Sequence, residues 1–173
     1  LKHQGNRYDP ARAWIEPYLA RVHYQILDPV PDYHPDILGD IHHLPFPDAA
    51  VDAILCIAVL EHVERPYQAV AEMHRVLKPQ GCCFLYVPFL FNYHAEQGYY
   101  GDYWRFTEDS LRLLCKSFTS MEIQSVRGAI ETWAHLGPWK RHHAVYRFAR
   151  MLDAVFKRQY SKQTSGYFVF LVK

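Results

Sequence analysis

The sequence has no apolar run long enough to cross a membrane, no secretory signal peptide at its start and no marked excess of charge. A membrane-spanning helix needs about 20 consecutive apolar residues, and no stretch of the 173 residues approaches that length. The formal net charge is only +1, without a long block of like charges, so the composition gives no argument for nucleic-acid binding. We therefore expect a cytoplasmic protein without a nucleic-acid partner.

The sequence also lacks the cysteine spacing of a disulfide or zinc framework. Its eleven histidines are scattered and do not complete a set of metal ligands. The four cysteines all lie within apolar patterns, where cysteine usually acts as a small buried residue: Cys56, Cys82, Cys83 and Cys115. We expect them to be reduced core residues, and we expect no metal site.

The clearest structural pattern is a strand, a helix and a second strand between Val51 and Val87. Val51–Val59 is a nearly continuous apolar run, which is typical of a strand buried on both faces of a parallel sheet. Pro66 suits the first turn of a helix, and Cys82–Val87 is a second apolar run. The right-handed crossover rule makes the two strands parallel. The pattern predicts an α/β domain with a doubly wound, Rossmann-like sheet.

In such sheets, ligands bind beyond the carboxyl ends of the strands, so the residues that follow each strand are informative. Polar residues stand at these positions. Asp28 ends a short predicted strand over Tyr24–Leu27, and Asp40 follows an extended piece near Leu38. The next strand is followed by Glu61 and His62, and the one after it by an aromatic loop that contains His94, Asp102 and Arg105. One edge of the sheet is therefore predicted to line a pocket.

The remaining chain contains further predicted elements. A helix is expected over about Pro10–Val22, and Thr107 is well placed to cap another. Met121–Val126 and Tyr167–Val172 have strand patterns. Between them, residues 129–165 form an insertion, in which 139–160 has one apolar face and an otherwise basic surface. This segment could be a lid, could bind an anionic ligand or could lie on a membrane surface.

Three segments together resemble the class I S-adenosylmethionine-dependent methyltransferases, in particular bacterial members that act on small molecules. The segments are DILGDIHHLPFPDAAVDAILCIAVLEHV, RPYQAVAEMHRVLKPQG and HAEQGYYGDYWRFTEDSLRLL, within about Asp28 to Phe118. The resemblance implies one methyltransferase-like domain over residues 1–173, with an N-terminal helix within 1–22, and S-adenosylmethionine as the cofactor.

The resemblance also implies cofactor contacts for individual residues. Asp28 corresponds to the acidic residue that accepts hydrogen bonds from the ribose hydroxyls. Asp40 corresponds to the carboxylate that accepts from the exocyclic amine of the adenine, and Ile41 to the side chain that packs on the adenine ring. Ala58 and Val59 correspond to the backbone beside the methionine part of the cofactor.

Glu61 and His62 match a Leu-Glu-His-Val element of these enzymes that lies near the cofactor. The chain departs from the family before this point, because only Gly5 occurs before Gly39. The family's first strand, in the middle of its sheet, and its glycine-rich turn are therefore missing, and such a turn needs positions without a side chain. Either the sequence is a fragment, or the protein is a degenerate relative.

Residues for the methyl acceptor are expected in the aromatic loop. His94 is the candidate general base, although it could instead hydrogen-bond Asp102 and order the loop. Tyr103 and Trp104 could pack on the acceptor or belong to the core. Arg105 could hold a phosphate or carboxylate of the substrate, or pair with an acidic residue at the start of the following helix.

Two hypotheses about function follow. The first is an S-adenosylmethionine-dependent methyltransferase acting on a small molecule, which could be anionic. The alternative is a non-catalytic relative that serves as a binding or assembly module, which the missing glycine-rich turn favours. A homodimer that supplies a strand is a further possibility, because an unpaired strand at the centre of a sheet invites pairing.

Overall fold

The computed structural model describes residues 16–19, 21–138 and 142–173, and the chain divides into two compact units, 1–45 and 46–173. Each unit is described by itself. Within the described residues, no helix combines the length and the apolar character that a membrane span requires. The prediction of one domain over the whole chain stays a prediction.

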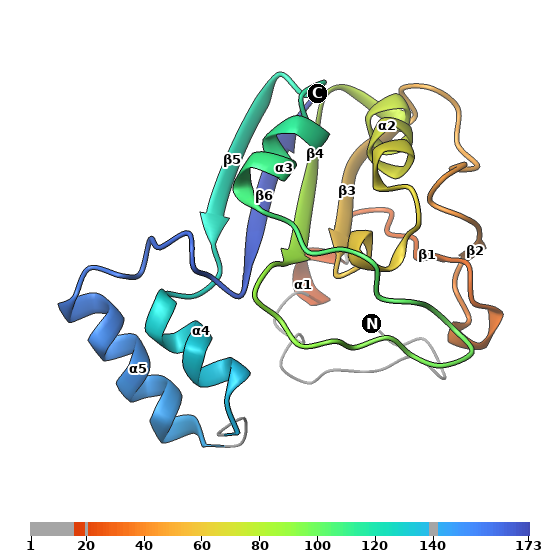
Figure 1. Cartoon of the computed structure of the whole chain (residues 1–173). Coiled ribbons are helices and arrows are strands. Elements are labelled where there is room, and N and C mark those ends of the chain that lie inside the picture. Colours follow the sequence, from red (N-terminus) through yellow and green to blue (C-terminus); the bar gives the residue numbers. More distant parts are fainter. Residues whose placement is uncertain (1–15, 20, 139–141) are drawn as a thin grey trace. The chain divides into compact units, whose positions relative to one another are not determined.

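The first unit contains a two-stranded parallel sheet (Figure 1). Strand β1 is Leu27–Asp28 and strand β2 is Ile37–Leu38, so the predicted strand of four residues before Asp28 is shorter than expected. A buried apolar face would be needed to hold a longer pair together. Helix α1, Glu16–Leu19, lies within the helix predicted over 10–22, of which residues 10–15 and 20 lie outside the described residues. The predicted end at Val22 is wrong, because residues 21 and 22 are not helical.

The second unit is built on a four-stranded sheet with the order β3-β4-β6-β5. Strands β3 and β4 are parallel, and β6 is antiparallel to both of its neighbours, β4 and β5. The bounds are Val51–Ile57 for β3, Leu77–Pro88 for β4, Ser120–Ser125 for β5 and Gly166–Val172 for β6. The strand, helix and strand predicted between Val51 and Val87, and the two later strands, are confirmed.

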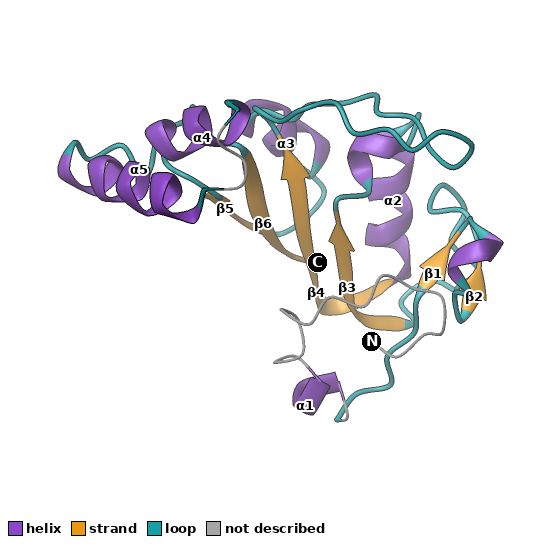
Figure 2. Ribbon diagram, turned by 90° about the horizontal axis from the view of Figure 1, so that it is seen from below, coloured by secondary structure: helices purple, strands orange, loops and turns teal. Residues whose placement is uncertain are grey.

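Helices α2, Pro66–Val76, and α3, Glu108–Leu114, lie on one face of this sheet (Figure 2). Pro66 occupies the first turn of α2, as predicted, and the buried side chains of α2 and the sheet form the core. Thr107 caps α3, because its Oγ1 accepts a hydrogen bond from the backbone N–H of Ser110. The predicted cap is confirmed. Cys56, Cys83 and Cys115 are buried and unbridged, whereas Cys82 is half-buried.

One prediction about β3 is wrong. The apolar run indicated burial on both faces, but Leu55 and Ile57 are 51% and 40% exposed, and among the side chains of β3 only Cys56 is buried. The strand has β4 on one side, and no described strand pairs with its other side. An apolar run indicates that the side chains of a strand are suited to burial, but it does not show which other element would pack against them. The homodimer stays a prediction.

The insertion folds as two helices that pack on each other, α4, Ala129–Leu136, and α5, His143–Val155 (Figure 1). The described part of the basic segment is helical, and residues 139–141 lie outside the described residues. Several large apolar side chains of α5 and the residue after it are exposed: Phe148, Met151, Val155 and Phe156. This exposure fits the predicted membrane-surface or lid role, which stays a prediction.

Candidate active site

The chain turns sharply where β3 ends. Ala58 has a φ of 54°, in the left-handed region that residues other than glycine seldom adopt. Its N–H donates to the carbonyl of Tyr86 on β4 at 3.0 Å, which fixes this conformation against the neighbouring strand. A 3₁₀ turn over Leu60–His62 follows directly. Glu61 and His62 are thereby held at the carboxyl end of β3, as the sequence predicted.

The aromatic loop after β4 is fastened to this turn by backbone hydrogen bonds. The N–H groups of Tyr103 and Trp104 both donate to the carbonyl of Glu61, at 2.7 and 3.2 Å. The indole Nε1 of Trp104 donates to the carbonyl of Val63 at 2.8 Å. Residues 41 positions apart in the chain are therefore brought together. The loop forms one wall of the candidate site.

Three side chains meet between the turn and the loop: Glu61, His62 and His94, here called the His–Glu cluster. The Nε2 atom of His94 lies 3.6 Å from Oε1 of Glu61, and Nε2 of His62 lies 3.9 Å from the same oxygen. The imidazole rings are in edge-to-face contact, with centroids 4.8 Å apart. The side chain of Glu61 is only 1% exposed. Sequence analysis predicted all three as site residues.

The other ring nitrogens of the two histidines face oxygen acceptors. Nδ1 of His62 lies 2.6 Å from the carbonyl oxygen of Gly101. Nδ1 of His94 lies 3.0 Å from the carbonyl oxygen of Asn92 and 3.3 Å from Oδ2 of Asp102. A carbonyl oxygen can only accept, so each Nδ1 carries a proton, and in the neutral imidazole each Nε2 then presents a lone pair. Both lone pairs are on the side of the rings that faces Glu61.

Burial dominates the electrostatics of the cluster. It raises the pKa of the Glu61 carboxyl and lowers the pKa of His62. Asp102 behaves differently, because hydrogen bonds from Arg105 lower the pKa of its carboxyl to about 2. The structure thus holds a buried carboxyl that resists ionisation close to a second carboxyl that is firmly ionised.

Arg105 is fully occupied by the protein. Its guanidinium donates to both carboxylate oxygens of Asp102, at 2.5 and 2.8 Å, and to three backbone carbonyls of the loop, Phe91, Asn92 and Trp104. These bonds use all five of its N–H groups. The alternative in which Arg105 pairs with the start of α3 is wrong, since Glu108 pairs with Arg112 instead.

Asp102 is the residue of this site whose importance the sequence did not reveal. Its side chain is fully buried, and besides Arg105 it accepts the backbone N–H of His94 at 2.9 Å. The contact between His94 and Asp102 that sequence analysis considered as an alternative to catalysis is therefore present. Asp102 and Arg105 carry opposite charges and are three residues apart, so their spacing could have predicted this ion pair. Tyr103 and Trp104 are exposed, and their predicted contacts with the acceptor stay predictions.

In the first unit, the predicted cofactor residues lie at the carboxyl edge of the small sheet. Asp28 ends β1, and Asp40 follows β2 by two residues. Oδ1 of Asp28 accepts the N–H of Val30 at 2.8 Å, and Oδ1 of Asp40 accepts the N–H of His42 at 2.9 Å and contacts its Nδ1 at 2.7 Å. Among the described residues, nothing hydrogen-bonds Oδ2 of either aspartate. Ile41, the predicted adenine contact, directly follows Asp40 and is half-buried.

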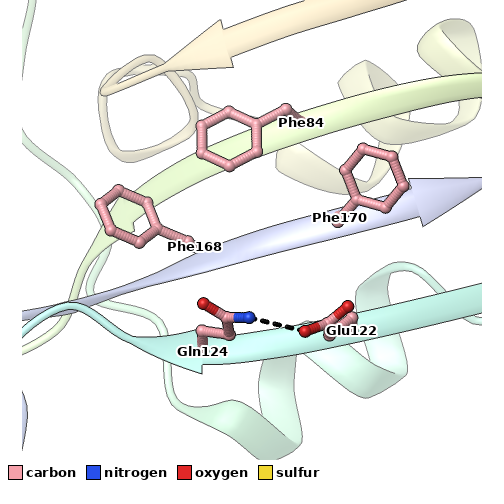
Figure 3. Close-up of a pocket in the computed structure, with 5 residues that line it drawn as sticks. All are labelled: Phe84, Glu122, Gln124, Phe168 and Phe170. Atoms are coloured by element: carbon pink, nitrogen blue, oxygen red, sulfur yellow. Dashed lines mark hydrogen bonds between the residues drawn. The ribbon is translucent and has the colours of Figure 1, made fainter.

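A shallow hollow of about 280 Å³ lies elsewhere, on the strands of the second unit (Figure 3). Its walls are three phenylalanine rings and one pair of polar side chains, in which Gln124 donates to Glu122 at 2.6 Å. The rings are those of Phe84, Phe168 and Phe170. The hollow contains none of the predicted site residues. Its lining is mainly apolar, so we do not regard it as the active site.

Comparison with known proteins finds similarity to methyltransferases in both sequence and fold. A family model described as a methyltransferase domain matches residues 18–85, a range that includes Asp28, Asp40 and Glu61. The matched segment, which is less than half of the chain, is similar to this methyltransferase domain. The match ends within β4, so the aromatic loop lies beyond it.

Individual sequences named as methyltransferases are similar to parts of the chain. An uncharacterized chloroplastic methyltransferase of Arabidopsis thaliana is 33% identical over 102 residues, which is 53% of this chain and 29% of that protein. An uncharacterized methyltransferase of Schizosaccharomyces pombe is 46% identical over 48 residues, 27% of this chain and 17% of that protein. The chain thus spans less than a third of the length of these relatives.

The fold comparison covers more of the chain. The crystal structure of a SAM-dependent methyltransferase from Archaeoglobus fulgidus superposes with a TM-score of 0.58 at 14% identity, over 85% of this chain and 74% of that one. This likeness confirms the predicted Rossmann-like fold. The family's first strand has no counterpart among the described strands, because β1 and β2 form one sheet and β3 to β6 form another.

Proposed function

We propose that the chain is the methyltransferase domain of an enzyme that transfers a methyl group from S-adenosylmethionine to a small molecule. The proposal rests on the position and the hydrogen bonding of the Asp28 and Asp40 carboxylates. Both lie within the matched range, at the carboxyl edge of parallel strands. Each has one carboxylate oxygen fixed by its own loop and, within the described residues, a second oxygen that is not hydrogen-bonded.

This arrangement fits the nucleoside half of the cofactor. The ribose hydroxyls and the exocyclic amine of adenine are hydrogen-bond donors, and an ionised carboxylate is a strong acceptor for them. The bonds to Val30 and His42 hold each carboxylate in one orientation before the ligand arrives, which reduces the ordering that binding requires. In this proposal Asp28 accepts from the ribose, Asp40 accepts from adenine and Ile41 packs on the ring.

The chemistry places few demands on the protein beyond alignment. The sulfonium carries its own leaving group, and positioning alone can supply on the order of 7 to 11 kcal/mol of the barrier. Ala58 and Val59, at the end of β3, are the proposed backbone beside the methionine part. A general base is needed only if the acceptor is a hydroxyl or a protonated amine, and His94 is the proposed residue.

The chemical class of the acceptor is a separate part of the proposal. The exposed rings of Tyr103 and Trp104 support an organic small molecule, because aromatic side chains offer flat apolar contact area. The anionic character of the acceptor was inferred from Arg105, whose N–H groups are all used within the loop. We therefore propose a small-molecule acceptor, and we do not propose that Arg105 binds an anionic group of it.

Asp28→Ala should weaken S-adenosylmethionine binding by about 1.5 to 3 kcal/mol, which is about 10- to 160-fold in Kd, because a hydrogen bond to a charged acceptor is lost. Isothermal titration of the variant and the parent chain measures this difference. Asp28→Asn keeps an oxygen for the N–H of Val30 and should still bind more weakly, because the charge is gone.

Asp32→Ala, an exposed aspartate of the same unit, is the matched control and should leave Kd within about twofold of the parent value. Equal affinities for the parent and both Asp28 variants would show that the ribose assignment is wrong.

The alternative is a relative that binds ligands or partners without catalysis. The similarity to methyltransferase sequences does not favour it. The two functions differ in a measurable way. A non-catalytic module would give no methylated product with any acceptor in a screen using S-adenosylmethionine labelled on the methyl group, even where the cofactor binds.

A further inference from the structure

We infer that Glu61, His62 and His94 form a binding site for a divalent transition-metal ion. Each residue offers one ligand atom, and the three atoms all lie within 4.8 Å of one another. They come from the turn after β3 and from the loop after β4, both within the second unit. The inference concerns only these residues, and it stands whether or not the chain transfers methyl groups.

The buried carboxylate is the first reason. Glu61 is almost completely shielded from solvent, and its Oε2 atom has no hydrogen-bond partner within the described part of the chain. A buried polar oxygen without a partner is rare in folded proteins, because its desolvation is not compensated. A cation bound by both oxygens of this carboxylate would supply the missing interaction.

The direction of the imidazole lone pairs is the second reason. The acceptors Gly101, Asn92 and Asp102 fix the proton of each histidine on Nδ1, so both Nε2 lone pairs face the Glu61 carboxylate. Three electron-rich groups then surround one space. Metal-binding histidines usually donate their other N–H to a carbonyl or carboxylate in this way, which orients the ring and strengthens its basicity.

Direct hydrogen bonds within the cluster do not explain the arrangement. The separations of 3.6 and 3.9 Å between the Nε2 atoms and Oε1 of Glu61 exceed the range of about 2.7 to 3.2 Å for an N–H···O bond. They are close to what an ion requires. Ligand distances of about 2.0 to 2.2 Å place neighbouring ligand atoms roughly 3 to 3.6 Å apart. The three ligand atoms lie within 4.8 Å of one another, so they would have to approach one another by up to about 1 Å to close around an ion.

The ligand set defines the class of ion. Two imidazoles and one carboxylate suit Zn²⁺, Mn²⁺, Fe²⁺, Co²⁺ or Ni²⁺, and are too rich in nitrogen for Ca²⁺ or Mg²⁺. Three protein ligands leave at least one position open. An ion on Nε2 of His94 would occupy the lone pair that a general base uses. It could instead activate an acceptor hydroxyl by lowering its pKa.

The test is a titration of the full chain with Zn²⁺, and separately with Mn²⁺, after treatment with a chelator and without S-adenosylmethionine. We expect one ion per chain. Glu61→Gln, His62→Ala and His94→Ala should each weaken binding at least 10- to 100-fold. His23→Ala removes an exposed histidine of the first unit and should not change the Kd.

Two results would overturn the inference: no binding of either ion by the parent chain, or binding that the three cluster variants leave unchanged, which would indicate surface histidines. A second measurement does not depend on the folding of any variant. Electron paramagnetic resonance of Cu²⁺ bound to the parent chain at one equivalent should show coupling to two imidazole nitrogens, and a spectrum without them would contradict the site.

Discussion

Replacing Asp102 with alanine is expected to lower the free energy of unfolding by about 2 to 4 kcal/mol. Removing one partner of a buried ion pair typically costs about 3 to 5 kcal/mol, because the other charge is left uncompensated. The Arg105 side chain is 27% exposed, so water would solvate part of its uncompensated charge, and we expect a loss near or just below the lower end of that range. The variant also leaves the backbone N–H of His94 without its acceptor.

Urea unfolding followed by circular dichroism measures this change. Asp48→Ala is the matched control, since Asp48 also pairs with an arginine, Arg75, but its side chain is 80% exposed. An exposed pair contributes about 0 to 1 kcal/mol. If both aspartate variants lose the same small amount of stability, Asp102 does not hold the loop, and the description of the site wall is wrong.

Asp153→Ala is expected to have a comparable effect on the α4–α5 pair. Asp153 is buried on α5, and its carboxylate accepts the backbone N–H groups of Ile130 and Glu131 at 2.9 and 2.8 Å. It therefore caps the N-terminal end of α4 from a different helix. Hydrogen bonds to a charged acceptor contribute about 1.5 to 3 kcal/mol each, so we expect the loss of both to cost about 3 to 6 kcal/mol.

Hydrogen exchange of the α4 amides measures this loss locally, because α4 can open without the sheet. Gly128→Ala provides an independent check. A Cβ at Gly128 would overlap the carboxylate of Asp153, so this variant should speed exchange of the same amides. Glu122→Ala, an exposed change on β5, is the control. Unchanged exchange in both Asp153→Ala and Gly128→Ala would rule out the capping role.

The parts of the fold that could be predicted are those encoded in local patterns. The apolar run of β3, the helix that begins at Pro66 and the cap at Thr107 are each specified by residues within a few positions of one another. The burial of the β3 side chains could not be predicted in this way. Leu55 and Ile57 have the side chains of buried residues, but their burial depends on elements outside the run.

The candidate site shows the same division. Glu61 and His62 could be placed, because they directly follow a recognisable strand. The approach of His94 could not, since it results from backbone hydrogen bonds between Glu61 and the loop, and backbone groups leave no signature in the sequence. The expectation of no metal site relied on ligand spacing within one segment. The His–Glu cluster draws its ligands from two segments, which that rule does not test.

The central claim is that this chain binds S-adenosylmethionine, and a calorimetric titration tests it most directly. The whole chain is titrated with S-adenosylmethionine and, separately, with the demethylated product S-adenosylhomocysteine. We predict binding of one molecule per chain with a Kd in the micromolar range for both ligands, since both carry the ribose and adenine that Asp28 and Asp40 would bind. An absence of binding by both ligands to the folded chain would contradict the proposal.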